Sequence, residues 1–179
     1  VASVIANAVM DGKPIGDMEA LGYYVIVATA GHDTTSASTA GGLLALMQNP
    51  EQMNKLRNDM SLLPQAIEEM FRWETPVKHF LRTATEDYTL RGKSIKAGDR
   101  LMMMYASGNR DEEVFSNPFE FQVDRRPNKQ VAFGYGVHRC LGHLLAKMEM
   151  SAFYRALLTK TSDIQLNGDP AYIHATFVS

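Results

Sequence analysis

The only cysteine of this 179-residue chain, Cys140, lies in the segment FGYGVHRCLG at residues 133–142. Gly134 and Gly136 can adopt positive φ, which lets the backbone turn sharply or approach a bound group closely. After Cys140, leucines and a methionine recur at helical spacing, so the cysteine lies at or just before a helix N-terminus. The unpaired amides at such a position favour the thiolate over the thiol. The segment therefore predicts a turn that presents one thiolate to a partner that binds sulfur.

Two other interpretations of this cysteine stay open on the residues alone. A lone cysteine is most often a small, buried hydrophobic side chain. It could also be a catalytic nucleophile, although neither a papain-like nor a caspase-like signature surrounds it. The glycine spacing and the start of a helix favour the sulfur ligand over both.

A second polar cluster interrupts the apolar stretch at residues 21–47. The run AGHDTT at residues 30–35 includes Asp33, Thr34 and Thr35, whose side chains compete with the backbone for hydrogen bonds and weaken a helix. Gly31 costs a helix about 1 kcal/mol relative to alanine. One interpretation is a buried helix that merely tolerates these residues. The other is a hydroxyl and a carboxylate held together for proton transfer.

A third pair, Glu69 and Arg72, lies three residues apart in QAIEEMFRWETP, so the two side chains can meet on one helical face. The spacing alone favours a solvated surface ion pair worth ~0.2–0.5 kcal/mol over a buried network.

Composition excludes several functional classes. A net charge of −2 argues against a nucleic-acid partner, and one cysteine excludes an internal disulfide and fits a reducing compartment. The sequence contains no phosphate-binding loop, no G-x-S-x-G elbow and no Rossmann fingerprint. No signal peptide or membrane-spanning stretch is apparent. We expect a soluble, cytoplasmic protein with neither a nucleic-acid nor a membrane partner.

The segment at residues 133–142 resembles the haem-thiolate loop of cytochrome P450 enzymes, F-G-x-G-x-H-x-C-x-G, at all six fixed positions. The resemblance implies haem b (heme b) as the cofactor and Cys140 as the axial ligand of its iron, a thiolate that favours O–O cleavage. His138 would then hydrogen-bond a haem propionate, and Phe133 and Gly134 would contact the haem.

The run AGHDTT is similar to the family's A-G-x-D/E-T-T motif on the distal helix. By that resemblance, Ala30 and Gly31 leave room for dioxygen over the haem. Thr34 would hydrogen-bond the dioxygen, and Asp33 would help to relay protons to it.

The family's E-x-x-R motif coincides with Glu69 and Arg72, and the meander arginine coincides with Arg125 in FQVDRRPN. The resemblance gives these three a structural role beneath the haem. It gives Arg82 a haem propionate as partner, since an arginine fork suits a carboxylate. Further contacts follow by position: Val77 and Ala146 would touch the haem, and the substrate pocket would include Val77, Phe80, Leu81 and Phe177.

The implied fold class is mainly α with small β-sheets (α+β), the C-terminal half of the cytochrome P450 fold. The expected parts are a distal helix at about 17–47, the E-x-x-R helix at about 62–74, strands at about 78–103, a meander at 112–132, the haem-thiolate loop at 133–142 and a proximal helix at 141–159. Residues 1–10 look like the tail of a preceding helix. We therefore expect a partial domain that lacks half of the haem pocket and is inactive when isolated.

The implied activity is that of a monooxygenase, which inserts one oxygen atom of dioxygen into a small hydrophobic substrate. YYVIVATAGHDTTSAS and SGNRDEEVFSNP are similar to the bacterial branch that hydroxylates terpineol, so a terpenoid or hydrocarbon is the expected substrate. The expected electron donor is a [2Fe-2S] ferredoxin with its NAD(P)H-dependent reductase, docked on a basic patch of Arg72, Arg139 and Lys147. The alternatives are peroxygenase or reductase chemistry on the same fold, or a fragment without cofactor.

Overall fold

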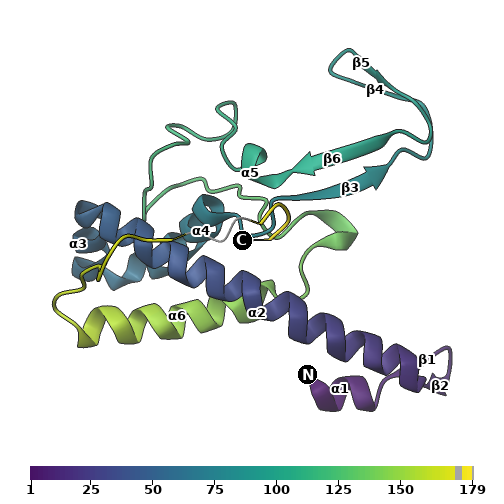
Figure 1. The fold of residues 1–179 in the computed structure, drawn as a ribbon, viewed down its shortest axis with the longest axis horizontal. Coiled ribbons are helices and arrows are strands. Elements are labelled where there is room, and N and C mark those ends of the chain that lie inside the picture. The colour runs from purple at the N-terminus through teal and green to yellow at the C-terminus, as the bar shows by residue number, and fades with distance from the viewer. Residues whose placement is uncertain (172–174, 179) are drawn as a thin grey trace.

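The computed structural model describes residues 1–171 and 175–178. In chain order its elements are α1 (Ala2–Ala6), β1 (Val9–Met10), β2 (Lys13–Pro14), α2 (Asp17–Gln48), α3 (Pro50–Asn58), the 3-10 helix η1 (Met60–Leu62), α4 (Leu63–Glu74), β3 (His79–Thr83), β4 (Tyr88–Leu90), β5 (Lys93–Ile95), β6 (Arg100–Met104), α5 (Tyr105–Gly108), the 3-10 helix η2 (Gly136–His138) and α6 (His143–Lys160) (Figure 1). This mainly helical architecture with small sheets confirms the predicted fold class.

The long helix α2 begins with a carboxylate cap and ends at a proline. The Glu19 carboxylate accepts the Gly16 backbone N–H at 2.9 Å, and acidic residues in the first turn suit the positive end of the helix dipole. At the other end, Asn49 leaves the helical conformation and Pro50 starts α3, a position where its missing N–H costs nothing. The helix is continuous through the polar run at residues 30–35.

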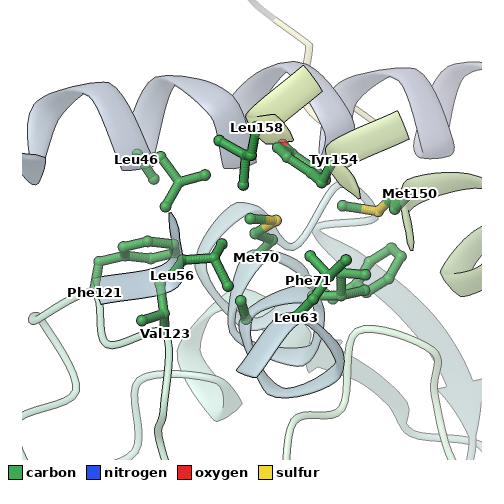
Figure 2. Packing of buried hydrophobic residues seen from close by; sticks show 13 residues of the cluster. Leu46, Leu56, Leu63, Met70, Phe71, Phe121, Val123, Met150, Tyr154 and Leu158 are labelled. Carbon is green, nitrogen blue, oxygen red and sulfur yellow. The ribbon is translucent and has the colours of Figure 1, made fainter. Parts of the chain in front are cut away.

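One hydrophobic core joins the C-terminal half of α2 to α3, α4 and α6 (Figure 2). Its buried members are Ala45, Leu46, Leu56, Leu63, Ala66, Ile67, Met70, Phe71, Phe121, Val123, Met150, Tyr154 and Leu158. Along α6 the buried positions Met150, Tyr154 and Leu158 recur every four residues, which places them on one helical face. This core fixes α2, α4 and α6, the three helices on which the candidate site is built.

The two halves of α2 lie in different environments. Leu46 is fully buried in the core, whereas Leu21 is 52% exposed and Ile26 is 57% exposed. Figure 1 shows this N-terminal half extending beyond helices α3, α4 and α6. Apolar residues exposed in such a run indicate a surface that another group covers.

Two antiparallel strand pairs form one extended arm of the molecule (Figure 1). β3 pairs with β6 in a register that runs from His79 opposite Met104 to Thr83 opposite Arg100. β4 and β5 form a hairpin whose turn residues Arg91 and Gly92 both have positive φ, as a two-residue turn of this hand requires.

Residues 109–135 form neither helix nor strand and cross the molecule between α5 and η2. Arg72 of α4 and Arg125 of the segment itself bind several of its backbone carbonyls, as described below. In the described part of the chain, no helix is both long enough and apolar enough to cross a membrane.

Candidate functional site

A buried ion-pair network joins Glu69 and Arg72 of α4 to Arg125 of the irregular segment. Arg72 donates from Nε to Glu69 Oε2 at 2.7 Å and from Nη2 to Oε1 at 2.8 Å. Arg125 donates from Nε to both carboxylate oxygens, at 3.1 and 3.0 Å. Asn128 and the backbone of Gln122 complete the coordination of the same carboxylate. Glu69 therefore carries two guanidinium partners, and burial without them would be prohibitively costly.

The remaining guanidinium donors of this network bind backbone carbonyls of the irregular segment. Arg72 donates to the carbonyls of Asn109, Pro118 and Glu120, and Arg125 to those of Ser116, Asn117 and Glu120. The network thus replaces the backbone pairing that residues 109–125 do not make with a helix or sheet.

Burial of Arg72 corrects one expectation. We expected Arg72 in a basic patch that docks ferredoxin, but its side chain is 0% exposed. Because all of its donors are occupied inside the protein and added chain could only cover it further, it cannot contribute to a docking surface. That part of the prediction is wrong.

The loop at residues 133–142 turns back on itself and leaves the thiol at the surface. Gly134 and Gly136 have φ of 69° and 67°, values that favour glycine, and no atom lies within 4 Å of a Cβ built on Gly136. The amide of Cys140 donates to the Phe133 carbonyl at 2.8 Å, closing the loop, and Cys140 itself is exposed.

Aromatic packing anchors the start of this loop to the core. The Phe133 ring lies 4.4 Å from that of Phe71 on α4, centroid to centroid, and the Lys147 ammonium lies 5.4 Å from its centre. Phe133 and Ala146 both pack against the hydrophobic core. The loop is therefore fixed at its base and open at its tip.

Helix α6 begins three residues after the thiol, with Gly142 as the N-cap. Apolar side chains beside Cys140 are exposed: Leu141, just before the helix, is 88% exposed, and Leu144 and Leu145 in its first turn are 64% and 52% exposed. The helical spacing of these residues was apparent in the sequence, but the face they define is not the core face, which Met150 and Tyr154 occupy. An apolar surface next to an exposed thiol suits a large, flat, apolar ligand.

The polar run of α2 is exposed in the same way. The Thr34 hydroxyl donates to the Ala30 carbonyl at 2.8 Å, and the Asp33 side chain is 78% exposed. No atom lies within 4 Å of a Cβ built on Gly31. Within residues 1–171 and 175–178, no hydrogen bond or ion pair links Asp33 or Thr34 to Cys140.

The predicted pocket residues meet at the base of the strand arm. The Phe80 and Phe177 rings lie 5.2 Å apart, and Val77 forms an isolated β-bridge with Val178. Leu81 is half exposed. Arg82 is half-buried and donates to the adjacent Leu81 carbonyl at 2.9 Å, which leaves most of its five donors available to an anion.

Three structural features near the site were not among the predicted site residues. Asn109 is fully buried and hydrogen-bonded to Thr75 and Val131. Tyr154 of α6 donates its hydroxyl to the Thr39 carbonyl of α2 at 2.6 Å. A Cβ on Gly42 would lie 2.8 Å from both Met70 Cγ and Tyr154 Oη, so this glycine permits the close approach of three helices.

The residues present fit a haem held by a thiolate. The exposed thiol of Cys140 supplies a soft ligand, the open backbone at Gly136 admits a close neighbour, and the apolar start of α6 adjoins both. Arg82 and His138 supply cationic or hydrogen-bonding groups for carboxylates. These features define a haem-thiolate class of site.

The chain belongs to the cytochrome P450 family, whose family model matches residues 5–162. It is 49% identical over 178 residues to cytochrome P450-terp of a Pseudomonas species, a match that covers 99% of this chain and 42% of that protein. The chain thus spans less than half the length of this relative. The cofactor of the family is haem b.

Solved cytochrome P450 structures are similar to nearly the whole of this chain. CYP108D1 from Novosphingobium aromaticivorans superimposes with a TM-score of 0.93 at 47% identity, covering 98% of this chain and 43% of that one. Mycobacterium marinum CYP268A2, solved in complex with pseudoionone, gives a TM-score of 0.93 at 42% identity, over 99% of this chain and 43% of that one.

Proposed function

We propose that the complete protein is a cytoplasmic haem-thiolate monooxygenase that inserts one oxygen atom of dioxygen into a small hydrophobic substrate. The observation that carries the proposal is the exposed Cys140 thiol, on a loop whose base the buried Glu69 network supports. The family membership and the name of the relative P450-terp support the same reaction class.

In this proposal the described residues hold the cofactor by three kinds of contact. Cys140 is the iron ligand, and Arg82 and His138 bind the propionates. The apolar or small residues Phe133, Gly134, Ala30, Gly31, Val77 and Ala146 provide its packing surface. The thiolate-bound haem supplies the cleavage of the O–O bond.

The protein's own contribution to oxygen chemistry is proton delivery by Asp33 and Thr34. Thr34 can exchange its present hydrogen bond to the Ala30 carbonyl for one to dioxygen, because the side chain is only part-buried. The exposed Asp33 carboxylate can take protons from solvent and pass them inward. This pair favours a monooxygenase over a peroxygenase, which needs no proton delivery to dioxygen.

The test is Thr34→Ala in the complete enzyme, with Ser36→Ala as the matched control. Loss of the Thr34 hydroxyl should uncouple electron use from product, so that NAD(P)H oxidation continues while product per NAD(P)H falls about tenfold or more. Ser36 lies two residues away and is exposed, and its loss should leave the ratio unchanged. Tight coupling in Thr34→Ala would overturn the proposed role.

For the substrate we propose a terpenoid or similar hydrocarbon. The support is likeness to P450-terp and to a structure that holds pseudoionone. Phe80, Leu81, Val77 and Phe177 would form one apolar wall of the pocket. Spectral titration with monoterpenes and with steroids of matched hydrophobicity tests this choice, and tighter binding of the steroids would contradict it.

For the electron donor we propose a [2Fe-2S] ferredoxin, reduced by an NAD(P)H-dependent reductase. Arg139 is exposed directly before the ligand, and it lines a polar groove of about 400 Å³ together with Arg126, Lys147 and Glu68. Lys147 already pairs with Glu68, so Arg139 is the stronger candidate.

Arg139→Glu should weaken ferredoxin binding and flatten its salt dependence. Arg91→Glu, at the distant tip of the β4–β5 hairpin, makes the same charge change and should do neither (Figure 1). Unchanged affinity and salt dependence in Arg139→Glu would contradict this docking surface.

A further inference from the structure

A continuous series of hydrogen bonds joins the buried ion-pair network to the amide of Cys140. Arg72 Nη1 donates to the Asn109 carbonyl at 2.8 Å, and Asn109 Oδ1 accepts the Val131 N–H at 2.7 Å. The Val131 carbonyl then accepts the Gly134 N–H at 2.8 Å. The same peptide group, between Phe133 and Gly134, accepts the Cys140 N–H at 2.8 Å.

Asn109 is the only side chain in this series between Arg72 and the loop, and it is held at both ends. Its Nδ2 donates at 2.8 Å to the Thr75 hydroxyl, which in turn donates to the Arg72 carbonyl at 2.8 Å. Asn109 and Thr75 are both fully buried. No rotation of the amide is therefore free, and Oδ1 is aimed at Val131.

Loss of the hydrogen bond between the Val131 N–H and Asn109 Oδ1 would destabilise the loop. An apolar residue at position 109 would leave the Val131 N–H without its partner in a part-buried position, and an unpaired buried amide is destabilising. The segment could recover a partner only by moving toward water. Residues 133–140 would move with it, because the Val131 carbonyl accepts the N–H of the Phe133–Gly134 peptide and the Cys140 N–H donates to the carbonyl of the same peptide.

We propose that Asn109 is a positioning residue for the thiolate: it fixes the Phe133–Gly134 peptide, and through it the place of Cys140. The inference rests on the proposed function in one respect, the role of Cys140 as iron ligand. Asn109 itself touches neither cofactor nor substrate. It affects the position of the sulfur and the hydrogen bond from the Cys140 N–H to the Phe133 carbonyl. Hydrogen bonds around a ligating residue tune a metal-bound thiolate.

The test compares four variants of the complete protein. Asn109→Ala removes the contact, Thr75→Val removes the hydroxyl that orients Asn109, and Thr75→Ser keeps that hydroxyl. Leu56→Ala opens a cavity in the core, and so reports what destabilisation alone does. Two quantities are measured: amide exchange at Val131 and Cys140, and the thiolate-ligated fraction of the folded, reduced protein under carbon monoxide.

In Asn109→Ala, exchange at Val131 should accelerate about tenfold or more relative to Leu56→Ala, and the thiolate-ligated fraction should fall. Thr75→Val should show a smaller effect of the same kind, and Thr75→Ser should match the wild type. If Asn109→Ala fails to fold, the Thr75→Val and Thr75→Ser pair decides the question.

The proposal is overturned if Asn109→Ala or Thr75→Val behaves like Leu56→Ala in both measurements. A wild type without any thiolate band would instead defeat the proposed function. The exchange rates of Val131 and Cys140 would still decide whether Asn109 fixes the loop.

Discussion

The Glu69 network and the Cys140 loop differ in burial and in how far their polar groups are paired. Glu69, Arg72 and Arg125 are buried, and every oxygen of the carboxylate accepts more than one hydrogen bond. Cys140 is exposed, and apolar side chains around it face solvent. The first region is complete within this chain, whereas the second presents groups to something else.

This difference explains why buried charge is tolerated in the Glu69 network and exposed apolar surface is tolerated around Cys140. A buried carboxylate is stable only with its partners fixed, so the network must be rigid before any ligand arrives. The exposed leucines at the start of α6 and along the first half of α2 become favourable when a cofactor and further protein cover them. Rigid support beneath an open ligand site is the arrangement that a preorganised metal site needs.

The largest expected effect comes from breaking the buried region. Glu69→Gln leaves two buried guanidinium groups without a carboxylate and should lower the free energy of unfolding by about 3–5 kcal/mol. Glu68→Gln, one residue earlier, removes the part-exposed ion pair with Lys147 and keeps an amide oxygen that can still accept the hydrogen bond from Gln130, so it should cost less than ~1 kcal/mol. Urea unfolding of the complete protein measures both. Equal losses of unfolding free energy in the two variants would contradict the claim that the buried network stabilises the protein more than the exposed pair does.

Two glycines of α2, Gly42 in the buried half and Gly31 in the exposed half, allow the same comparison with a smaller expected change in stability. Gly42→Ala forces a methyl group against Met70 and Tyr154, and the overpacking cost of about 1–3 kcal/mol exceeds the roughly 1 kcal/mol gained in helix propensity. Gly31→Ala meets no atom of the described chain, and should leave stability unchanged or raise it by up to ~1 kcal/mol. Thermal unfolding of the cofactor-free protein should therefore show a lower midpoint for Gly42→Ala and an equal or higher midpoint for Gly31→Ala, and a loss of stability in both would contradict the account.

The smallest effect concerns the third acidic residue of α4, Glu74, which lies against Gly41 of α2. Burial raises the pKa of Glu74, and the charges of Lys78 and Arg110 only partly oppose this shift. The folded protein therefore binds this proton more tightly than the unfolded chain, and stability falls as pH rises from the ordinary value of 4.5 through the raised pKa.

Glu74→Gln removes that titration. Relative to wild type, the variant should gain stability progressively as pH rises above 4.5, measured by urea unfolding at a series of pH values. A stability difference that is constant with pH would contradict the assignment.

Much of the fold was predictable because its signals are local. The resemblance at AGHDTT, E-x-x-R and the cysteine loop gave the fold class, and periodicity indicated the helix after Cys140. The expected helix at 62–74 lies where the structure has α4 at Leu63–Glu74, and the expected strands at 78–103 lie where it has β3 to β6.

The remainder depends on contacts between distant residues. Asn109 binds residues 34 and 22 positions away, so the family-like run SGNRDEEVFSNP in which it lies does not by itself reveal these contacts. The Tyr154 contact with Thr39 spans 115 positions. The placement of Arg72 on a docking surface was wrong because an i, i+3 ion pair reads the same whether it is solvated or buried, and only the tertiary structure decides.

The central claim is that Cys140 is a haem ligand, and one measurement tests it most directly. The complete protein is reduced under carbon monoxide and its Soret band is recorded, beside Cys140→Ser prepared in the same way. The account predicts a thiolate-type Soret shift in the wild type and its loss in Cys140→Ser, with the secondary structure of the two proteins the same by circular dichroism. A wild type without the shift, or a Cys140→Ser variant that keeps it, would contradict the claim.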